Sequence, residues 1–320
     1  MINLCVIIPA YNEENTIIDT VKDYQSAFPN ARIIVIDNNS SDDTANKAKQ
    51  ILDLKKDLLI TEYQKGKGFA VKAGISRLEA DIYVMTDGDD TYPASDAKKL
   101  VEIMLKTRVD MLIGDRISGG SYSSQNTRIG HNLGNKSMSF VISKLTGKKF
   151  NDVFSGLRIM SRPLVNALDI SSPGFQLETE LNVLSAYLRA DIQEVQIGYN
   201  ARKDDSSSKL NTFRDGFKIL RFAFFNWLLF VPLQPFLILA TIMLLLSFGL
   251  GYRIISGFLA TGFNYSTTAV VASASILIAI CSIFFGLSLH IIGRNNRRRE
   301  IASFLEKKRK WNTRLDEKDI

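Results

Sequence analysis

Two long stretches without a charged side chain constrain most strongly what this chain can fold into. The first runs from Phe222 to Tyr252 and the second from Ile254 to Gly293. Each exceeds the roughly 20 apolar residues that a helix needs to cross the hydrocarbon core of a bilayer. Buried helices of a large soluble core are the alternative, but such helices seldom lack charges for so long. The sequence therefore predicts two transmembrane helices, at about 228–252 and 269–292.

The basic residues around these stretches predict how the chain is oriented. The segment 256–268, which connects the two predicted transmembrane helices, is uncharged, and Arg253 is a minor exception at the outer end of the first helix. Because cytoplasmic flanks carry an excess of Lys and Arg, we expect both termini on the cytoplasmic side of a multi-pass protein of the cytoplasmic membrane. The basic residues on the outer flanks are Lys209, Arg214, Lys218, Arg221, Arg294, Arg297, Arg298 and Arg299.

The net charge of +7 is concentrated near the C-terminus, where residues 294–320 contribute +5. The first 226 residues are close to neutral, so the composition gives no support to nucleic-acid binding. The chain has two cysteines, Cys5 and Cys281, and no disulfide framework, which suits a reducing compartment. The start of the chain lacks the basic segment and apolar core of a signal peptide.

The first 200 residues alternate short apolar runs with helical patterns, which is typical of an α/β fold with a mostly parallel sheet. We expect this domain at 1–209, an amphipathic helix on the membrane surface at 210–227, and a basic cytoplasmic tail at 293–320. Residues 118–127, rich in serine and glycine, are expected to form a flexible loop. The expected strands are Leu4–Ile8, Arg32–Ile36, Leu58–Thr61, Ile82–Thr86 and Met111–Gly114, and the expected helices are Glu13–Phe28, Asp42–Leu54, Phe69–Leu78 and Ala94–Lys106.

Three carboxylates, Asp87, Asp89 and Asp90, follow directly after an apolar strand, with Gly88 among them. Ligands of open parallel sheets bind beyond the carboxyl ends of the strands. Carboxylates this close repel one another unless a cation compensates them, and Mg²⁺ or Mn²⁺ commonly takes one or two carboxylates while substrate phosphates complete its shell. An Asp-rich turn that caps the following helix explains the pattern equally well.

A second polar cluster, the sequence QKGKG at 64–68, places Lys65 and Lys67 at an expected helix start. Backbone N–H groups and the helix dipole favour anions there. The spacing does not fit a P-loop, and a basic surface turn is the alternative. Lysines for phosphates beside carboxylates for a metal together indicate a site for a nucleoside diphosphate.

The chain resembles family 2 glycosyltransferases of the GT-A fold, which have a Rossmann-like, mostly parallel sheet. More narrowly it resembles the polyprenyl-phosphate glycosyltransferases, the group of dolichol-phosphate mannose synthase and undecaprenyl-phosphate glucosyltransferases. The resemblance covers nearly all of residues 3–221, and two C-terminal spans match the membrane-anchored bacterial branch. The motifs that carry it, in order, are VIIPAYNEENTI, VIDNNSSDDT, KGKGFAVKAG, TDGDDTYP, GDR, DVFSGLRIMSR, GFQLETEL and SSSKLN.

This resemblance implies transfer of a hexosyl group from a UDP- or GDP-sugar to polyprenyl phosphate, by inverting displacement at the cytoplasmic membrane face. It implies that Asp87 and Asp89 hold Mg²⁺ or Mn²⁺ together with the diphosphate. Many relatives have Gln where this chain has Thr91, so water or Asp90 would complete the metal shell here. The residues implied to bind the nucleotide sugar are Pro9, Tyr11, Glu13, Asp37, Lys65, Lys67, Asp87 and Asp89.

For the acceptor side, a phosphate monoester is largely dianionic at neutral pH and hardly needs a general base. It needs cations, which Arg supplies with bidentate geometry. Asp152 matches the position proposed as a base in relatives, and we favour a positioning role for it. Glu178 and Glu180 could line the acceptor side or simply favour a helix start, and neither histidine has ligand spacing. The expected catalytic residues are Asp89, Asp152 and Arg158, and those for the acceptor phosphate are Arg116, Arg128, Arg202, Ser207, Ser208 and Lys209.

Two alternatives stay open from the sequence. A polysaccharide synthase would normally have more spans and a Q-x-x-R-W motif, neither of which this chain shows. A catalytically inactive membrane scaffold would not need the Asp87/Asp89 and Lys65/Lys67 pairs that this chain keeps. The sequence fixes neither the sugar, the base nor the lipid length, and it is compatible with a homo-oligomer.

Overall fold

The computed structural model describes residues 2–119, 131–172, 174, 176–200, 225, 231, 233–263 and 265–318. The chain forms two compact units. The first joins Met1–Ile219 with Glu300–Ile320, and the second comprises Leu220–Arg299. Each unit is described by itself below.

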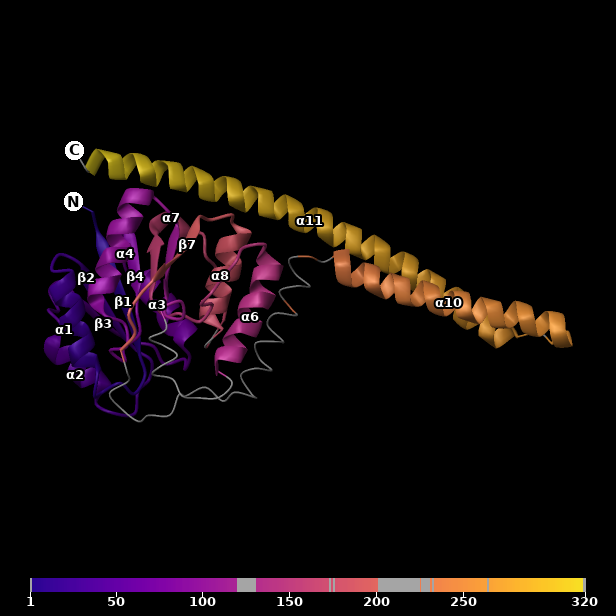
Figure 1. Ribbon diagram of the computed structural model, residues 1–320, viewed down its shortest axis with the longest axis horizontal. Helices are drawn as coiled ribbons and strands as arrows, with labels where there is room; N and C mark the ends of the chain where they lie inside the picture. Colours follow the sequence, from indigo (N-terminus) through magenta and orange to yellow (C-terminus); the bar gives the residue numbers. More distant parts are fainter. Residues whose placement is uncertain are drawn as a thin grey trace. The chain divides into compact units, whose positions relative to one another are not determined.

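The first unit is built on one seven-stranded sheet with the order β3-β2-β1-β4-β6-β5-β7 (Figure 1). Every strand pair in it is parallel except those that involve β6, which runs antiparallel to both β4 and β5. The start of β6 therefore lies at the same edge as the carboxyl ends of its neighbours. The strands are β1 (Leu4–Ala10), β2 (Arg32–Asp37), β3 (Leu58–Thr61), β4 (Ile82–Met85), β5 (Met111–Asp115), β6 (Arg158–Ser161) and β7 (Ile192–Gln196).

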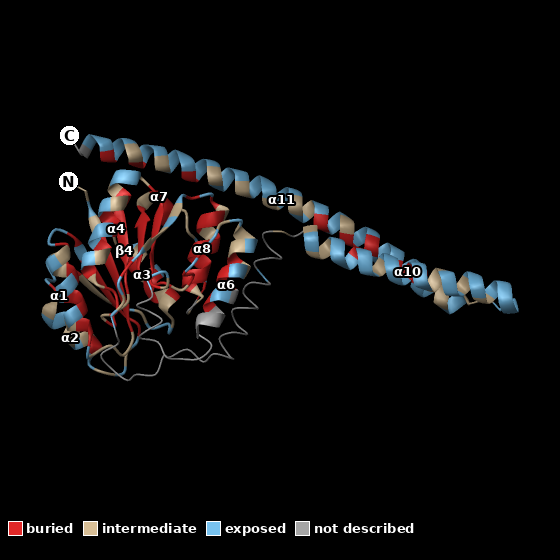
Figure 2. Cartoon of the chain, viewed as in Figure 1, coloured by how far each residue is buried: buried red, intermediate tan, exposed pale blue. Residues whose placement is uncertain are grey.

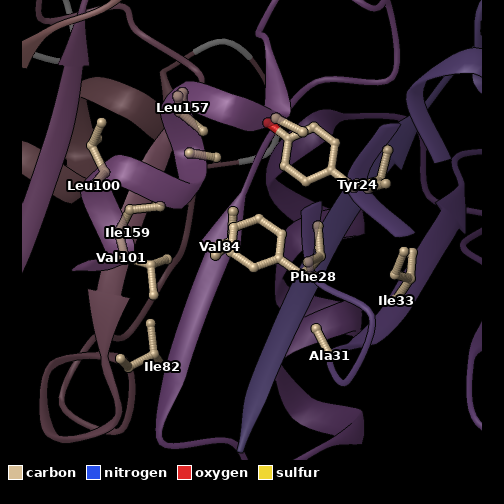
Figure 3. Close-up of a cluster of buried hydrophobic side chains, with 14 of the residues drawn as sticks. Tyr24, Phe28, Ala31, Ile33, Ile82, Val84, Leu100, Val101, Leu157 and Ile159 are labelled. Carbon is tan, nitrogen blue, oxygen red and sulfur yellow. The ribbon is translucent and has the colours of Figure 1, made fainter. Parts of the chain in front are cut away.

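Helices pack on the sheet and leave the central strands almost without solvent contact (Figure 2). The aromatic rings of Tyr24 and Phe28 stack with centroids 6.2 Å apart and pack into a core beside Val84 of the central strand β4 (Figure 3). Burial of such side chains stabilises the unit by about 1.5–3 kcal/mol each. The helices are α1 (Ile17–Ala27), α2 (Thr44–Ile51), α3 (Lys67–Arg77), α4 (Ala94–Thr107), α6 (His131–Thr146), α7 (Arg162–Val165) and α8 (Leu177–Tyr187).

The structure confirms the α/β class with a mostly parallel sheet and all five expected strands, four of them with ends shifted by one or two residues. The four expected helices are present, with α1 beginning later than expected, at Ile17, and α3 earlier, at Lys67. Two strands, β6 and β7, were not expected. Their short runs carry Arg158, Gln193 and Glu194, and these polar residues hide the strand pattern.

The second unit contains α10 (Leu233–Thr261) and the first part of α11 (Ser266–Lys318). Both helices are long and apolar enough to cross a membrane, with mean hydropathies of 2.1 and 2.5 over their most apolar windows. Large apolar side chains such as Phe248 and Leu259 are about four-fifths exposed, unlike those of a soluble core. The helix α10 lies later in the chain than the expected 228–252 span, and α11 continues through the expected tail at 293–320. The expected amphipathic segment 210–227 lies, apart from Phe225, outside the described residues.

Candidate active site

Of the predicted site residues that the structure describes, most lie where the carboxyl ends of β1, β2, β4 and β5 meet the start of β6. Arg158 pairs in register with Met85 at the end of β4 and with Ile113 near the end of β5. At the other side of β4, the end of β1 faces the end of β2, where Ala10 pairs with Asp37. Residues spread over most of the first unit thus meet at a single edge.

The turn that follows β4 is held in place by two threonines of the α1 region. The hydroxyls of Thr16 and Thr20 both donate to the carbonyl oxygen of Gly88, at 2.8 and 3.2 Å. A side chain at Gly88 would press on the Ala10 methyl group at 3.3 Å, so glycine allows this turn to lie close to β1. The following Asp90 has a φ of +58°. Asp87 and Asp89 are therefore presented by a fixed turn.

Asp89 is buried and its carboxylate is oriented by Thr91. The hydroxyl of Thr91 donates to Asp89 Oδ1 at 2.6 Å, and the Thr91 backbone N–H donates to the same oxygen at 3.3 Å. Thr91 is itself 1% exposed. Its side chain therefore holds the Asp89 carboxylate and is not placed as a third metal ligand.

Lys67, the first residue of α3, bridges two carboxylates. Its Nζ lies 2.5 Å from Asp87 Oδ1 and 2.5 Å from Glu178 Oε1 on α8. Burial alone would lower the pKa of Lys67, but the charges of Asp87 and Glu178 outweigh it and hold this pKa above its usual range. The ammonium group is thus fixed in its charged form beside the strand end.

Arg158 is fully buried beneath the loop 152–157. Its guanidinium donates to the carbonyl oxygens of Ser155 and Val153, at 3.1 and 3.3 Å, and to Asn182 Oδ1 at 2.6 Å. Asn182 in turn donates to the Val153 carbonyl at 3.2 Å. In the same loop, Gly156 lies so close to the Asp87 carboxylate that any added Cβ would collide with it. Arg158 therefore positions this loop and has no exposed surface with which to touch a substrate.

Arg116 and Asp152 form a buried, bidentate ion pair. Arg116 Nε lies 2.7 Å from Asp152 Oδ2, and Nη2 donates to Oδ1 at 2.9 Å. Burial opposes ionisation of Asp152, but the Arg116 charge and hydrogen bonds prevail and hold its pKa below the usual range. The guanidinium also lies 5.9 and 5.5 Å from the ring centres of Tyr92 and Tyr199, within cation–π range.

The end of β2 organises the side of the edge where a nucleotide is expected. Asn38 donates to the carbonyls of Glu62 and Gln64 and accepts from the Gly66 N–H at 2.6 Å, which fixes the loop that carries Lys65. Lys65 Nζ lies 3.4 Å from the hydroxyl of Tyr11. The neighbouring Asp37 is 5% exposed, and its buried Oδ1 has no hydrogen-bond partner among the described residues. A buried oxygen such as Asp37 Oδ1 is normally hydrogen-bonded, so an N–H or O–H group of a ligand would fit here.

The oxygen chemistry of this edge fits a divalent cation, because Asp87 and Asp89 stand two residues apart after β4 and carboxylate oxygens are ligands that Mg²⁺ and Mn²⁺ prefer. Within the described part of the chain, no three His, Cys, Asp or Glu side chains form a metal-binding group. Two protein carboxylates plus phosphate oxygens and water would therefore make up the shell.

The remaining predicted residues divide into three groups. Glu180 accepts from the backbone N–H groups of Ser171 and Ser172 at 3.0 and 2.9 Å, so it closes a loop and does not line the site. Pro9 and Glu13 lie at and just beyond the end of β1, as expected. The acceptor candidates outside the described residues are Arg128, Arg202, Ser207, Ser208 and Lys209. Residues that sequence reasoning missed are Thr16, Thr20, Asn38, Tyr92, Asn182 and Tyr199, which act through contacts between distant segments.

Comparisons with known proteins agree with this geometry. The model of the glycosyl transferase family 2 matches residues 5–168. Glycosyltransferase AglJ of Haloferax volcanii is 30% identical over 303 residues, covering 90% of this chain and 94% of that protein. A dolichyl-phosphate hexose transferase of the same organism is 27% identical over 214 residues, covering 67% and 89%.

Two solved structures are similar in fold. Glucosyl-3-phosphoglycerate synthase from Mycobacterium tuberculosis, in complex with Mn²⁺ and UDP-glucose, has a TM-score of 0.50 at 21% identity and covers 71% of this chain and 79% of that one. Mannosyl-3-phosphoglycerate synthase from Rubrobacter xylanophilus has a TM-score of 0.53 at 16% identity, with coverages of 71% and 74%. At these identities the likeness shows the fold. The chain belongs to glycosyl transferase family 2 and is a glycosyltransferase of the GT-A fold.

Proposed function

We propose that this glycosyltransferase moves a hexosyl group from a UDP- or GDP-sugar to polyprenyl phosphate, at the cytoplasmic face of the membrane. The observation that carries the proposal is the placement of Asp87, Asp89 and Lys67 at one sheet edge, in a chain with two apolar helices. The relative named as a dolichyl-phosphate hexose transferase supports the lipid acceptor.

In this proposal the donor lies across the ends of β1, β2 and β4. Asp37 accepts from the base or ribose, and Lys65, near Tyr11, faces the diphosphate. Asp87 and Asp89 would hold Mg²⁺ or Mn²⁺, which supplies positive charge to the diphosphate as it leaves. Lys67 adds a fixed positive charge at the same place, and such preorganised charge is the main source of stabilisation in sites of this kind.

The nucleophile is expected to be an oxygen of the acceptor's phosphate group, which is already deprotonated at neutral pH. A phosphate dianion attacks the anomeric carbon from the face opposite the diphosphate, so the configuration inverts and no proton needs to be removed. This agrees with the geometry of Asp152, whose carboxylate is engaged by Arg116 and held ionised. Arg116 itself stays a candidate for the acceptor, since a guanidinium has five donors. The others are Arg128, Arg202, Ser208 and Lys209.

The membrane arrangement is also proposed: two spans, with both ends of the chain in the cytoplasm. Residues 300–318 belong to the same compact unit as the N-terminal domain. This supports the proposal that both lie on one side of the membrane, with an even number of crossings between them. A reporter fused after Ile320 should read cytoplasmic and one inserted near Asn264 should read external, and the opposite reading of either would reject two spans.

The decisive experiment incubates the purified full-length protein with polyprenyl phosphate and a panel of labelled nucleotide sugars, with and without Mn²⁺. We expect one nucleotide sugar to give an organic-extractable, mild-acid-labile lipid product only when metal is present. Growth of a polymer would instead indicate a polysaccharide synthase. Absence of both transfer and donor hydrolysis with every sugar would indicate an inactive scaffold.

A further inference from the structure

The last part of α11 packs into the first unit by one apolar stripe. Trp311 and Leu315 are 3% and 0% exposed and belong to the main hydrophobic cluster of the unit. Phe304, seven residues before Trp311, is 1% exposed. With Lys308 these residues recur at helical spacing on a single face. Residues on the other face, such as Arg309 and Lys310, are exposed.

Polar contacts fix the same face of the helix. The Trp311 indole N–H donates to the carbonyl oxygen of Asp81 at 3.0 Å. Lys308 Nζ lies 2.7 Å from Asp110 Oδ2, and Arg314 Nε lies 3.6 Å from Asp81 Oδ1. Both carboxylates are fully buried within the unit. A buried carboxylate destabilises the fold unless it is paired. Lys308 and Arg314 supply the positive charges that pair with Asp110 and Asp81.

These contacts lie at the edge of the sheet opposite the candidate active site. Asp81 directly precedes β4 and Asp110 directly precedes β5, whereas Asp87 and Arg116 follow the far ends of the same two strands. In Figure 1 the yellow end of α11 accordingly lies close to the N-terminus of the chain. The helix therefore anchors the starts of two strands whose other ends carry the site.

We propose that Glu300–Lys318 is the closing element of the catalytic unit, a built-in partner of the sheet edge at the starts of β4 and β5 and not a lipid-attracting tail. The catalytic unit is then discontinuous in sequence. It is completed only after the ribosome has made both apolar helices, and this inference is independent of which sugar or acceptor the enzyme uses.

The test compares the thermal unfolding and limited proteolysis of full-length variants in detergent. Trp311→Ala and Lys308→Ala should each lower the Tm, the former by on the order of 10 °C, and should expose the N-terminal domain to protease. The matched controls on the exposed face, Arg309→Ala and Lys310→Ala, should leave the Tm unchanged. If Trp311→Ala does not accumulate, Trp311→Phe, which keeps the apolar body and loses the N–H, should show a smaller fall. An unchanged Tm for Trp311→Phe and Lys308→Ala would overturn the proposal.

A cross-linking arm identifies the occupant. Carbodiimide activates accessible carboxylates and joins them to nearby amines. Arg108 Nη2 lies 3.2 Å from Oδ1 of the exposed Asp316, so we expect Arg108→Lys to give a cross-link to Asp316 in the monomer band. A cross-link found only in dimers would reject an intrachain closing element and assign the surface to a second copy. Because Tm, proteolysis and cross-linking need no substrate, their outcome is separate from that of the transfer assay.

Discussion

Lys67 Nζ is shared between Asp87 Oδ1 and Glu178 Oε1, at 2.5 Å from each. Asp87 is an expected metal ligand, so the lysine and a divalent ion would compete for one carboxylate. Glu178 would keep a partner for the ammonium group if Asp87 bound the metal. The position suits a cation that passes from the carboxylate to the phosphates of an arriving donor.

We therefore expect Lys67→Met to tighten Mn²⁺ binding in the absence of nucleotide by roughly 10-fold, the effect of one charge-assisted contact. The same variant should weaken UDP binding. Titration of Mn²⁺ by electron paramagnetic resonance measures the first and calorimetry the second. Lys72→Met, an exposed lysine on the same helix, is the control. Weaker Mn²⁺ binding by Lys67→Met would contradict this account.

Asp89→Ala should abolish transfer while the fold and membrane insertion remain, because the variant removes one of two repelling carboxylates. EDTA should inhibit the wild type, and Mn²⁺ should restore it. Thr91→Val removes the hydroxyl that orients Asp89. It should weaken Mn²⁺ binding less than Asp89→Ala does. Full activity in chelator would remove the metal from the mechanism.

Asp152→Asn should act mainly on stability, costing about 3–5 kcal/mol at neutral pH because it leaves Arg116 buried without its counter-ion. The folded pKa of Asp152 is depressed, so its contribution is present above the unfolded pKa, near 4, and is lost as pH falls through the folded pKa. Chemical unfolding of both proteins at several pH values should show a difference that shrinks in acid. Unchanged stability with a large loss of kcat would instead make Asp152 a general base.

Arg158→Lys should not preserve activity, since one ammonium group cannot reach Ser155, Val153 and Asn182 together as the guanidinium does. Asn182→Ala should produce the same defect, because it removes the amide oxygen to which Arg158 donates. In both variants we expect a lower Tm and a lower kcat with little change in the KM for the donor. Their effects should be far from additive in the double variant. Additive effects would show that the two residues act separately.

Lys209→Ala should raise the KM for polyprenyl phosphate by roughly 10- to 100-fold, the loss of one charge-assisted contact. The KM for the nucleotide sugar should stay nearly constant. If Lys209 only attracts anionic lipid, the effect should be about 1 kcal/mol and should vanish in neutral lipid or high salt. A defect mainly in the donor KM would move Lys209 to the diphosphate side.

The class of fold, the two apolar helices and the carboxylate and lysine clusters of the candidate site could all be predicted from the amino-acid sequence. These features are local. The alternation of strands and helices, the absence of charge over a bilayer's width, and the Asp-Gly-Asp turn are each written within one short segment.

The surroundings of the charged residues could not be predicted in the same way, because they depend on the folded chain. Arg158 and Asp152 look like site residues in their motif, yet one is buried under a loop and the other is paired with Arg116. Trp311 was expected in a basic tail, but it lies in the core and donates to the carbonyl oxygen of Asp81. This contact joins residues 230 positions apart, so no local pattern could predict it. Whether a charge meets substrate, solvent or a buried counter-ion depends on such long-range contacts, which no local pattern records.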